Sequence, residues 1–126
     1  MSAVADAARA AVGVRFRLHG REVATGLDCV GLAALALRAG GYGGPVPTGY
    51  PLRSGDAGAV AGLLDRGMIR VEAPAPGDLL LMRSGPGQLH LGIVTDTGLV
   101  HADAGLRRVV ERPGVPPWPV LGGWRL

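Results

Sequence analysis

The pattern of apolar and polar residues changes from helical to strand-like about halfway along the chain. Residues 2–12 are rich in alanine, and residues 28–39 are apolar on nearly every side of a helix, so the second segment predicts a buried central helix. A third helix is expected to begin at Ser54, a favourable N-cap residue, and to run to about Arg66. Residues 42–54 between these two helices have the composition of a proline- and glycine-rich loop.

After Gly67 apolar residues alternate with polar ones or form short runs, which is typical of strands. Residues 89–96 and 99–103 are expected to form a hairpin around a tight turn. Helices followed by antiparallel strands define the α+β class, here with N-terminal helices packed on one face of a small antiparallel sheet. The predicted strands cover residues 68–72, 78–83, 89–96, 99–103, 106–112 and the segment near 121–126.

Composition narrows the possible chemistry. The chain has 126 residues, which fits a single domain over residues 1–126. Cys29 is the only cysteine, so a disulfide framework and a cysteine-rich zinc site are excluded. The sequence contains no lysine, which excludes a P-loop and Schiff-base chemistry, and no asparagine, which excludes a papain-type Cys-His-Asn triad.

Charge and hydropathy limit the expected partners. The net charge is only +3 and the arginines are scattered, so we expect no nucleic-acid partner. The apolar stretches are too short to span a bilayer, so we expect no membrane insertion. Residues 1–13 do not resemble a signal peptide, because Asp6 and Arg9 interrupt their apolar run. We therefore expect synthesis in the cytoplasm.

Cys29 stands in the first turn of the predicted helix 28–39, with Asp28 at the N-cap position. The helix macrodipole and the free N–H groups at a helix start lower the pKa of a thiol and favour the thiolate. A lone cysteine is more often a small buried apolar residue, so position alone does not make Cys29 catalytic.

Two histidines favour the catalytic interpretation. If the hairpin turn has two residues, His90, His101 and Asp103 lie on the same face of the two strands. A metal site made of Cys29, His90 and His101 lacks a fourth ligand, so we expect no metal and no other cofactor. The opposite face of the hairpin carries the apolar residues Leu89, Leu91, Ile93, Val100 and Ala102.

These residues predict nucleophilic catalysis. The Cys29 thiolate would attack an acyl carbon while His90 takes up and returns the proton. A third polar residue would orient the imidazole of His90, and His101 is the first candidate and Asp103 the alternative. The backbone N–H of Cys29 would stabilise the oxyanion.

Three ordered motifs resemble the NlpC/P60 family of cysteine peptidases. They are GLDCVGLAALALRAGGY, then APGDLLLM, then QLHLGIVTDTGLVHAD, and the resemblance covers roughly residues 5–110. It implies a papain-like α+β fold, with Cys29 as nucleophile, His90 as base and His101 as third member. It also implies cleavage of peptidoglycan stem peptides, commonly at a D-glutamyl to diamino-acid bond. The sequence is most similar to the short phage-tail and gene-transfer-agent branch.

Two positions depart from the family pattern. Val30 follows the cysteine where a serine is usual, and Phe16 stands where a tyrosine is usual. Family members use these hydroxyls, with the aspartate before the cysteine, to hold the free amine of the substrate. Asp28 and Phe16 are therefore the predicted substrate-binding residues, and the departures leave the form of the stem peptide open.

The resemblance also implies a bacterial setting and partners. The expected partners are a peptidoglycan peptide and the tail or baseplate proteins of a phage-like particle, so the protein is expected to be associated with the virion tail. The proline-rich residues 113–119, with Trp118 and Trp124, are the expected docking surface, although both tryptophans could simply pack. The alternatives are a non-catalytic tail assembly module and an amidase or acyltransferase on the same fold.

Overall fold

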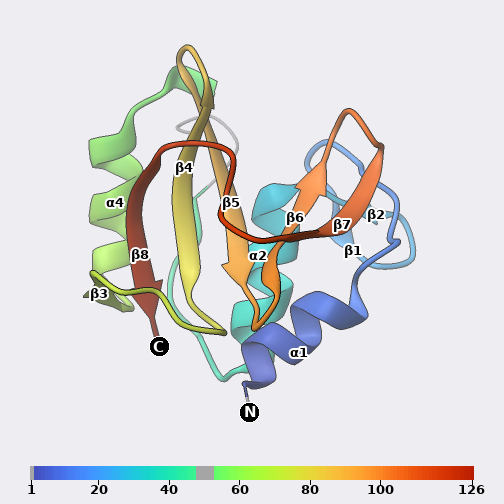
Figure 1. Ribbon diagram of the computed structural model, residues 1–126, viewed down its shortest axis with the longest axis horizontal. Coiled ribbons are helices and arrows are strands. Elements are labelled where there is room, and N and C mark those ends of the chain that lie inside the picture. The colour runs from blue at the N-terminus through green and yellow to red at the C-terminus, as the bar shows by residue number, and fades with distance from the viewer. Residues whose placement is uncertain (1, 48–52) are drawn as a thin grey trace.

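The protein is described by a computed structural model over residues 2–47 and 53–126 (Figure 1). It has the predicted α+β composition, with a six-stranded sheet in the order β3-β8-β4-β5-β6-β7 and a two-stranded ribbon of β1 and β2. All the strand pairs in both sheets are antiparallel. The helices are α1 (Ala3–Ala10), α2 (Cys29–Ala39) and α4 (Ala57–Asp65). The strands are β1 (Arg21–Glu22), β2 (Gly26–Leu27), β3 (Ile69–Val71), β4 (Leu79–Gly85), β5 (Gln88–Val94), β6 (Gly98–Asp103), β7 (Arg108–Pro113) and β8 (Val120–Arg125).

The helix starts follow capping chemistry. The side chain of Ser2 accepts a hydrogen bond from the N–H of Ala5 and caps α1. The prediction that Ser54 caps the third helix is wrong: Asp56 is the N-cap of α4 and accepts from the N–H of Ala59 at 3.0 Å. Aspartate caps as well as serine does, and here it lies immediately before the helix. Of the predicted loop at 42–54, residues 48–52 lie outside the described residues.

The core has two layers, one on each face of the sheet. The larger layer lies between the sheet and the helices, and α2 is its centre, as predicted, because most of its residues are buried. A smaller cluster on the opposite face contains Leu80, Met82 and Leu99, with Val94 and Trp118 packed against them. In Figure 1 the chain between β7 and β8 crosses this opposite face in front of the strands.

The β5–β6 hairpin has the predicted two-residue turn. Thr95 donates its N–H to the carbonyl of Gly98 at 2.9 Å, and Ile93 and Val94 pair with Val100 and Leu99. This register places His90 and His101 on one face, and the apolar residues of the opposite face enter the larger core as expected.

The β5 and β6 strands pair only next to their turn. Beyond it β6 runs away from β5 together with β7, and Figure 1 shows α2 in the opening between them. Both strands still contact α2. The first turn of this helix therefore lies where the sheet is open, which is the position of the candidate site.

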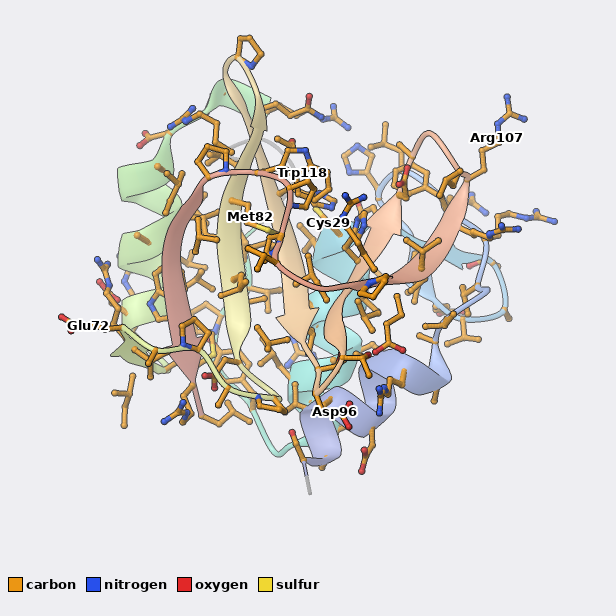
Figure 2. All side chains as sticks on the ribbon, in the orientation of Figure 1. Cys29, Glu72, Met82, Asp96, Arg107 and Trp118 are labelled. Atoms are coloured by element: carbon orange, nitrogen blue, oxygen red, sulfur yellow. The ribbon has the colours of Figure 1, made fainter. Side chains whose placement is uncertain are left out.

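The last strand enters the sheet in a place that the sequence order does not indicate. β8 lies between β3 and β4 and pairs with both of them. The chain between β7 and β8 must therefore cross β6, β5 and β4 to reach this position. This crossing carries Trp118 over the sheet (Figure 2).

Candidate active site

Cys29 is the first residue of α2, directly after its N-cap. The Oδ1 atom of Asp28 accepts a hydrogen bond from the N–H of Gly31 at 2.8 Å, which fixes the start of the helix. The N–H of Cys29 belongs to the first turn and so has no carbonyl partner within α2. Cys29 as a whole is half-buried, its sulfur is surrounded by protein, and it forms no disulfide. The thiol therefore stands beside an N–H group that is available to a ligand.

Asp28 also hydrogen-bonds the segment of residues 19–21, which thereby lies against the start of α2. Its Oδ2 atom accepts from the N–H of His19, and its Oδ1 atom accepts from Nη1 of Arg21, both at 2.8 Å. With the bond from Gly31, the carboxylate takes three donors while the residue is only 5% exposed. Asp28 is thus a buried and neutralised structural anchor. Its predicted contact with substrate stays a prediction.

Close packing of two glycines brings this segment against α2. A side chain at Gly31 would collide with the backbone carbonyl of Gly20. The N–H of Phe16 donates to the carbonyl of Arg107 at 2.9 Å, while Leu27 donates to Arg15 at 2.9 Å. Residues 15–16 therefore bridge β2 and the start of β7, and this bridge carries the Phe16 ring to the cleft.

His90 and His101 form a direct pair. Nε2 of His90 lies 3.0 Å from Nδ1 of His101, and the two rings are nearly perpendicular at 85°. One of these nitrogens must carry the shared proton. Since Nε2 of His90 is engaged, Nδ1 is the ring nitrogen left to exchange a proton with a substrate or a thiol.

Asp103, the alternative orienting residue, has a different partner. Its Oδ1 atom accepts from the N–H of Leu106 at 3.0 Å and closes the turn between β6 and β7. The carboxylate still lies in the same cleft as the histidines and raises the pKa of both. Of the two candidates, His101 is the one in hydrogen-bond contact with His90.

Trp118 completes a group of three rings. Its centroid lies 5.3 Å from that of His90 and 5.2 Å from that of His101, at interplanar angles of 77° and 88°. Figure 2 shows Trp118 and Cys29 at the same end of the sheet, with Asp96 at the opposite end. No pattern in the sequence predicts this contact, because it depends on the path of the chain between β7 and β8.

Trp124, by contrast, belongs to the core. It is fully buried, and its indole N–H donates to Asp65 at 2.8 Å. Trp124 therefore takes no part in a docking surface at residues 113–119, and the prediction that it does is wrong. Its alternative interpretation as a packing residue is confirmed.

A cleft of about 300 Å³ brings the predicted residues together. Cys29, His90 and His101 line it with Asp28, Phe16 and Asp103, so every predicted site residue reaches the same cavity. Val30, Leu89 and Ala102 add apolar surface. Residues that sequence reasoning missed also line the cleft: Leu18, Arg53, Ser84, Gln88, Ala104, Gly105 and Trp118.

Burial sets the charges in the cleft. It raises the pKa of the Cys29 thiol to about 11, the Asp28 carboxylate adds to this rise, and the N–H groups of Leu91 and Val30 oppose it. The contact with the N–H of Leu91 places the thiol against β5, at the residue that follows His90 in the chain. The lowered thiol pKa expected from the helix start is therefore not found, because desolvation of the sulfur outweighs it.

The histidines are shifted in the opposite direction. Burial lowers the pKa of His90 to about 4, and the charge of His101 lowers it further while Asp103 opposes the shift. Burial also lowers the pKa of His101, with Asp103 opposing and Arg112 assisting. At neutral pH the resting site therefore holds a thiol and two neutral imidazoles.

Within residues 2–47 and 53–126, no three His, Cys, Asp or Glu side chains are grouped so that they could hold a metal ion. None of the helices in that part of the chain is long and apolar enough to cross a membrane.

No protein-family model matches the chain, and no curated protein matches it significantly. The family resemblance therefore rests on the sequence motifs alone.

Proposed function

We propose that this protein is a cysteine peptidase of the NlpC/P60 type that hydrolyses peptidoglycan stem peptides. The observation that carries the proposal is the 3.0 Å contact between Nε2 of His90 and Nδ1 of His101 in the cleft that also holds Cys29. A nucleophile, a base and a residue that orients the base are the three groups that hydrolysis by a cysteine uses, and here the start of a helix and two neighbouring strands carry them. The α+β architecture is compatible with a papain-like fold.

The reaction begins with proton transfer during attack, because the resting thiol and His90 are both neutral. Sγ of Cys29 forms a bond to the carbonyl carbon, and its proton passes to Nδ1 of His90. The negative charge that develops on the carbonyl oxygen is stabilised by the N–H of Cys29 at the positive end of the α2 dipole. For Nδ1 to take up this proton, Nε2 of the neutral His90 must carry the ring proton and donate it to Nδ1 of His101, and this hydrogen bond holds the ring in place.

The second half returns the proton and releases the products. The imidazolium of His90 protonates the leaving amine as the C–N bond breaks, which leaves an acyl group on Sγ of Cys29. A water molecule then gives its proton to His90 and attacks the thioester carbon. The thiol leaves with the proton of His90, and the acid product departs. Each cycle consumes one water molecule and restores both neutral groups.

The family resemblance suggests the substrate bond and the setting. We infer cleavage between a D-glutamyl residue and a diamino acid in a peptidoglycan peptide, by a protein carried in the tail or baseplate of a phage-like particle. The isolated chain should cut soluble muropeptides slowly and intact cell walls poorly. Mass spectrometry of purified particles tests the location. Absence of the protein from all tail fractions would contradict this part of the proposal.

The activity is tested with soluble muropeptides and analysis of products by mass spectrometry. The expected products are a peptide that ends in D-glutamate and one that begins with the diamino acid. Cys29→Ala should abolish cleavage. Arg66→Ala should not change it, because Arg66 is the exposed C-cap residue of α4 and does not line the cleft. Cleavage by Cys29→Ala at the wild-type rate, or no cleavage by the folded wild-type protein, would contradict the proposal. Transfer of the acyl group to an added amine in place of water would favour the acyltransferase alternative.

A further inference from the structure

The residues between β7 and β8 form a strap across the outer face of the sheet. Residues 114–119 run in front of the strands in Figure 1 and end where β8 begins. Trp118 lies between Pro117 and Pro119. Both flanking residues have a fixed φ angle and lack an N–H, so the strap presents the indole with little backbone freedom.

The indole is held from behind by the smaller core cluster. Trp118 packs against Leu80, Met82 and Leu99 of the outer sheet face. On its other side it meets both imidazoles, with ring centroids 5.3 Å from His90 and 5.2 Å from His101. The distances and the steep angles are those of edge-to-face aromatic contacts. Trp118 is therefore fixed to the sheet and covers the histidine pair.

An apolar ring in this position changes the chemistry of the pair. It removes water that would otherwise compete for the shared proton between His90 and His101. It also disfavours a positive charge on either ring, because it replaces hydration with an apolar neighbour. The charged or titratable groups in the cleft around the pair are Asp28 and Cys29 at the start of α2, Arg53 before α4 and Asp103 from β6. Arg112 from β7 also lowers the pKa of His101.

We propose that Trp118 is a positioning residue that shields the His90–His101 hydrogen bond from water and keeps both imidazoles neutral until substrate is attacked. This inference rests on the proposed function for its catalytic meaning. The shielding of the pair from water can be measured without substrate. Trp118 affects catalysis only through its contacts with His90 and His101.

The test compares Trp118→Ala, Trp118→Phe and Val115→Ala. Val115 lies on the same strap, is 86% exposed and does not line the cleft, so its variant controls for changes in the strap itself. Phenylalanine keeps an apolar ring in the position of the indole, so Trp118→Phe tests shielding without opening a cavity as large as that of the alanine variant. Circular dichroism and urea unfolding establish that each variant is folded.

The first readout is NMR of the imidazoles. In the wild-type protein and in Val115→Ala, the shared N–H should exchange slowly with water, and the His90 ring should stay neutral down to acidic pH. Trp118→Ala should make that proton exchange quickly and raise the midpoint of the His90 titration by about one unit or more. In Trp118→Phe, the exchange rate of the shared N–H and the midpoint of the His90 titration should be close to the wild-type values. Unchanged exchange and a midpoint that moves by less than about 0.3 units in Trp118→Ala would overturn the proposal.

The second readout is the pH profile of hydrolysis. Trp118→Ala should lower kcat by about tenfold and move its acidic limb to higher pH, since a larger fraction of His90 is then protonated. A purely structural role would lower activity equally at every pH and would contradict the proposal. If no variant and no wild-type sample hydrolyses muropeptides, the proposed function fails. The NMR comparison still decides whether Trp118 shields the pair.

Discussion

Arg21 donates a hydrogen bond from Nη1 to Oδ1 of Asp28 at 2.8 Å, and Asp28 directly precedes Cys29 in the chain. The same oxygen accepts from the N–H of Gly31, and the second oxygen accepts from the N–H of His19. One buried carboxylate thus joins β1, the preceding loop and the first turn of α2. This junction sets the position of Cys29 relative to the cleft.

The junction predicts a large effect on stability. Asp28→Ala removes a helix cap and leaves the N–H of His19 without its acceptor, so we expect a loss of about 2–3 kcal/mol in the free energy of unfolding. Asp56→Ala removes only the exposed cap of α4 and should cost about 1 kcal/mol. Urea unfolding of both variants makes the comparison. Equal losses would show that Asp28 does no more than cap its helix.

The Arg21–Asp28 pair also predicts substrate selection. A carboxylate that already accepts from three donors has little capacity left for a substrate amine, and neither Val30 nor Phe16 carries a hydroxyl to assist it. Acetylation of the substrate's amino end should therefore change kcat/KM by less than about fivefold. Arg21→Ala should increase the preference for a free amine, because it leaves the negative charge of Asp28 unpaired. A wild-type loss of a hundredfold or more on acetylation would contradict this interpretation.

His101 and Asp103 should differ in their effect on catalysis. His101 contacts Nε2 of His90, so His101→Ala should lower kcat by about 10²-fold with a smaller change in KM. The side chain of Asp103 closes the turn to Leu106, so Asp103→Asn should keep kcat within about threefold. Steady-state kinetics on the same muropeptide measures both variants. A larger loss for Asp103→Asn than for His101→Ala would assign the orienting role to Asp103.

The shifted pKa values predict a stability maximum near neutral pH. The pKa of His90 falls from 6.5 to about 4 on folding, so the unfolded state binds more protons between these values and stability decreases as pH falls through them. The pKa of Cys29 rises from 9.0 to about 11, so stability also decreases as pH rises from 9.0 to about 11. The contribution of His90 should be of the order of 3 kcal/mol.

Thermal unfolding at a series of pH values measures how stability decreases on the acidic and on the alkaline side of its maximum. His90→Gln should make the acidic limb shallower but not abolish it, because the lowered pKa of His101 also reduces stability as pH falls below 6.5. Cys29→Ala should flatten the alkaline limb. The lowered pKa values of Asp65 and Glu111 act only below their ordinary values of 3.8 and 4.5, so they fall largely outside the His90 window. If both variants keep the wild-type profile, neither group is buried in the way described here.

Local rules made much of the site predictable. Asp28 is a strong capping residue before an apolar segment, so the start of α2 and the place of Cys29 followed from sequence. A two-residue turn fixes which side chains share a face of a hairpin, so the approach of His90 and His101 also followed, and their hydrogen bond confirms it.

The remaining features depend on tertiary structure. The position of β8 between β3 and β4 is set by packing between segments far apart in the chain, and the contact of Trp118 with the histidines follows from that path. The separation of β5 and β6 beyond their turn exposes the site to α2, and no periodicity encodes it. The pKa of the Cys29 thiol is raised, whereas the sequence predicts that it is lowered. The sequence shows the position at a helix start, but the burial of the sulfur depends on the folded cleft.

Cys29 should carry the acyl group of the substrate during hydrolysis. The most direct measurement is the intact mass of the protein after mixing with excess muropeptide and acid quenching within the first turnover. We predict a species heavier by the mass of the acyl part of the substrate, mapped by peptide analysis to Cys29, and its absence in Cys29→Ala. Turnover of the muropeptide by Cys29→Ala, or an adduct on another residue with Cys29 unmodified, would contradict the account.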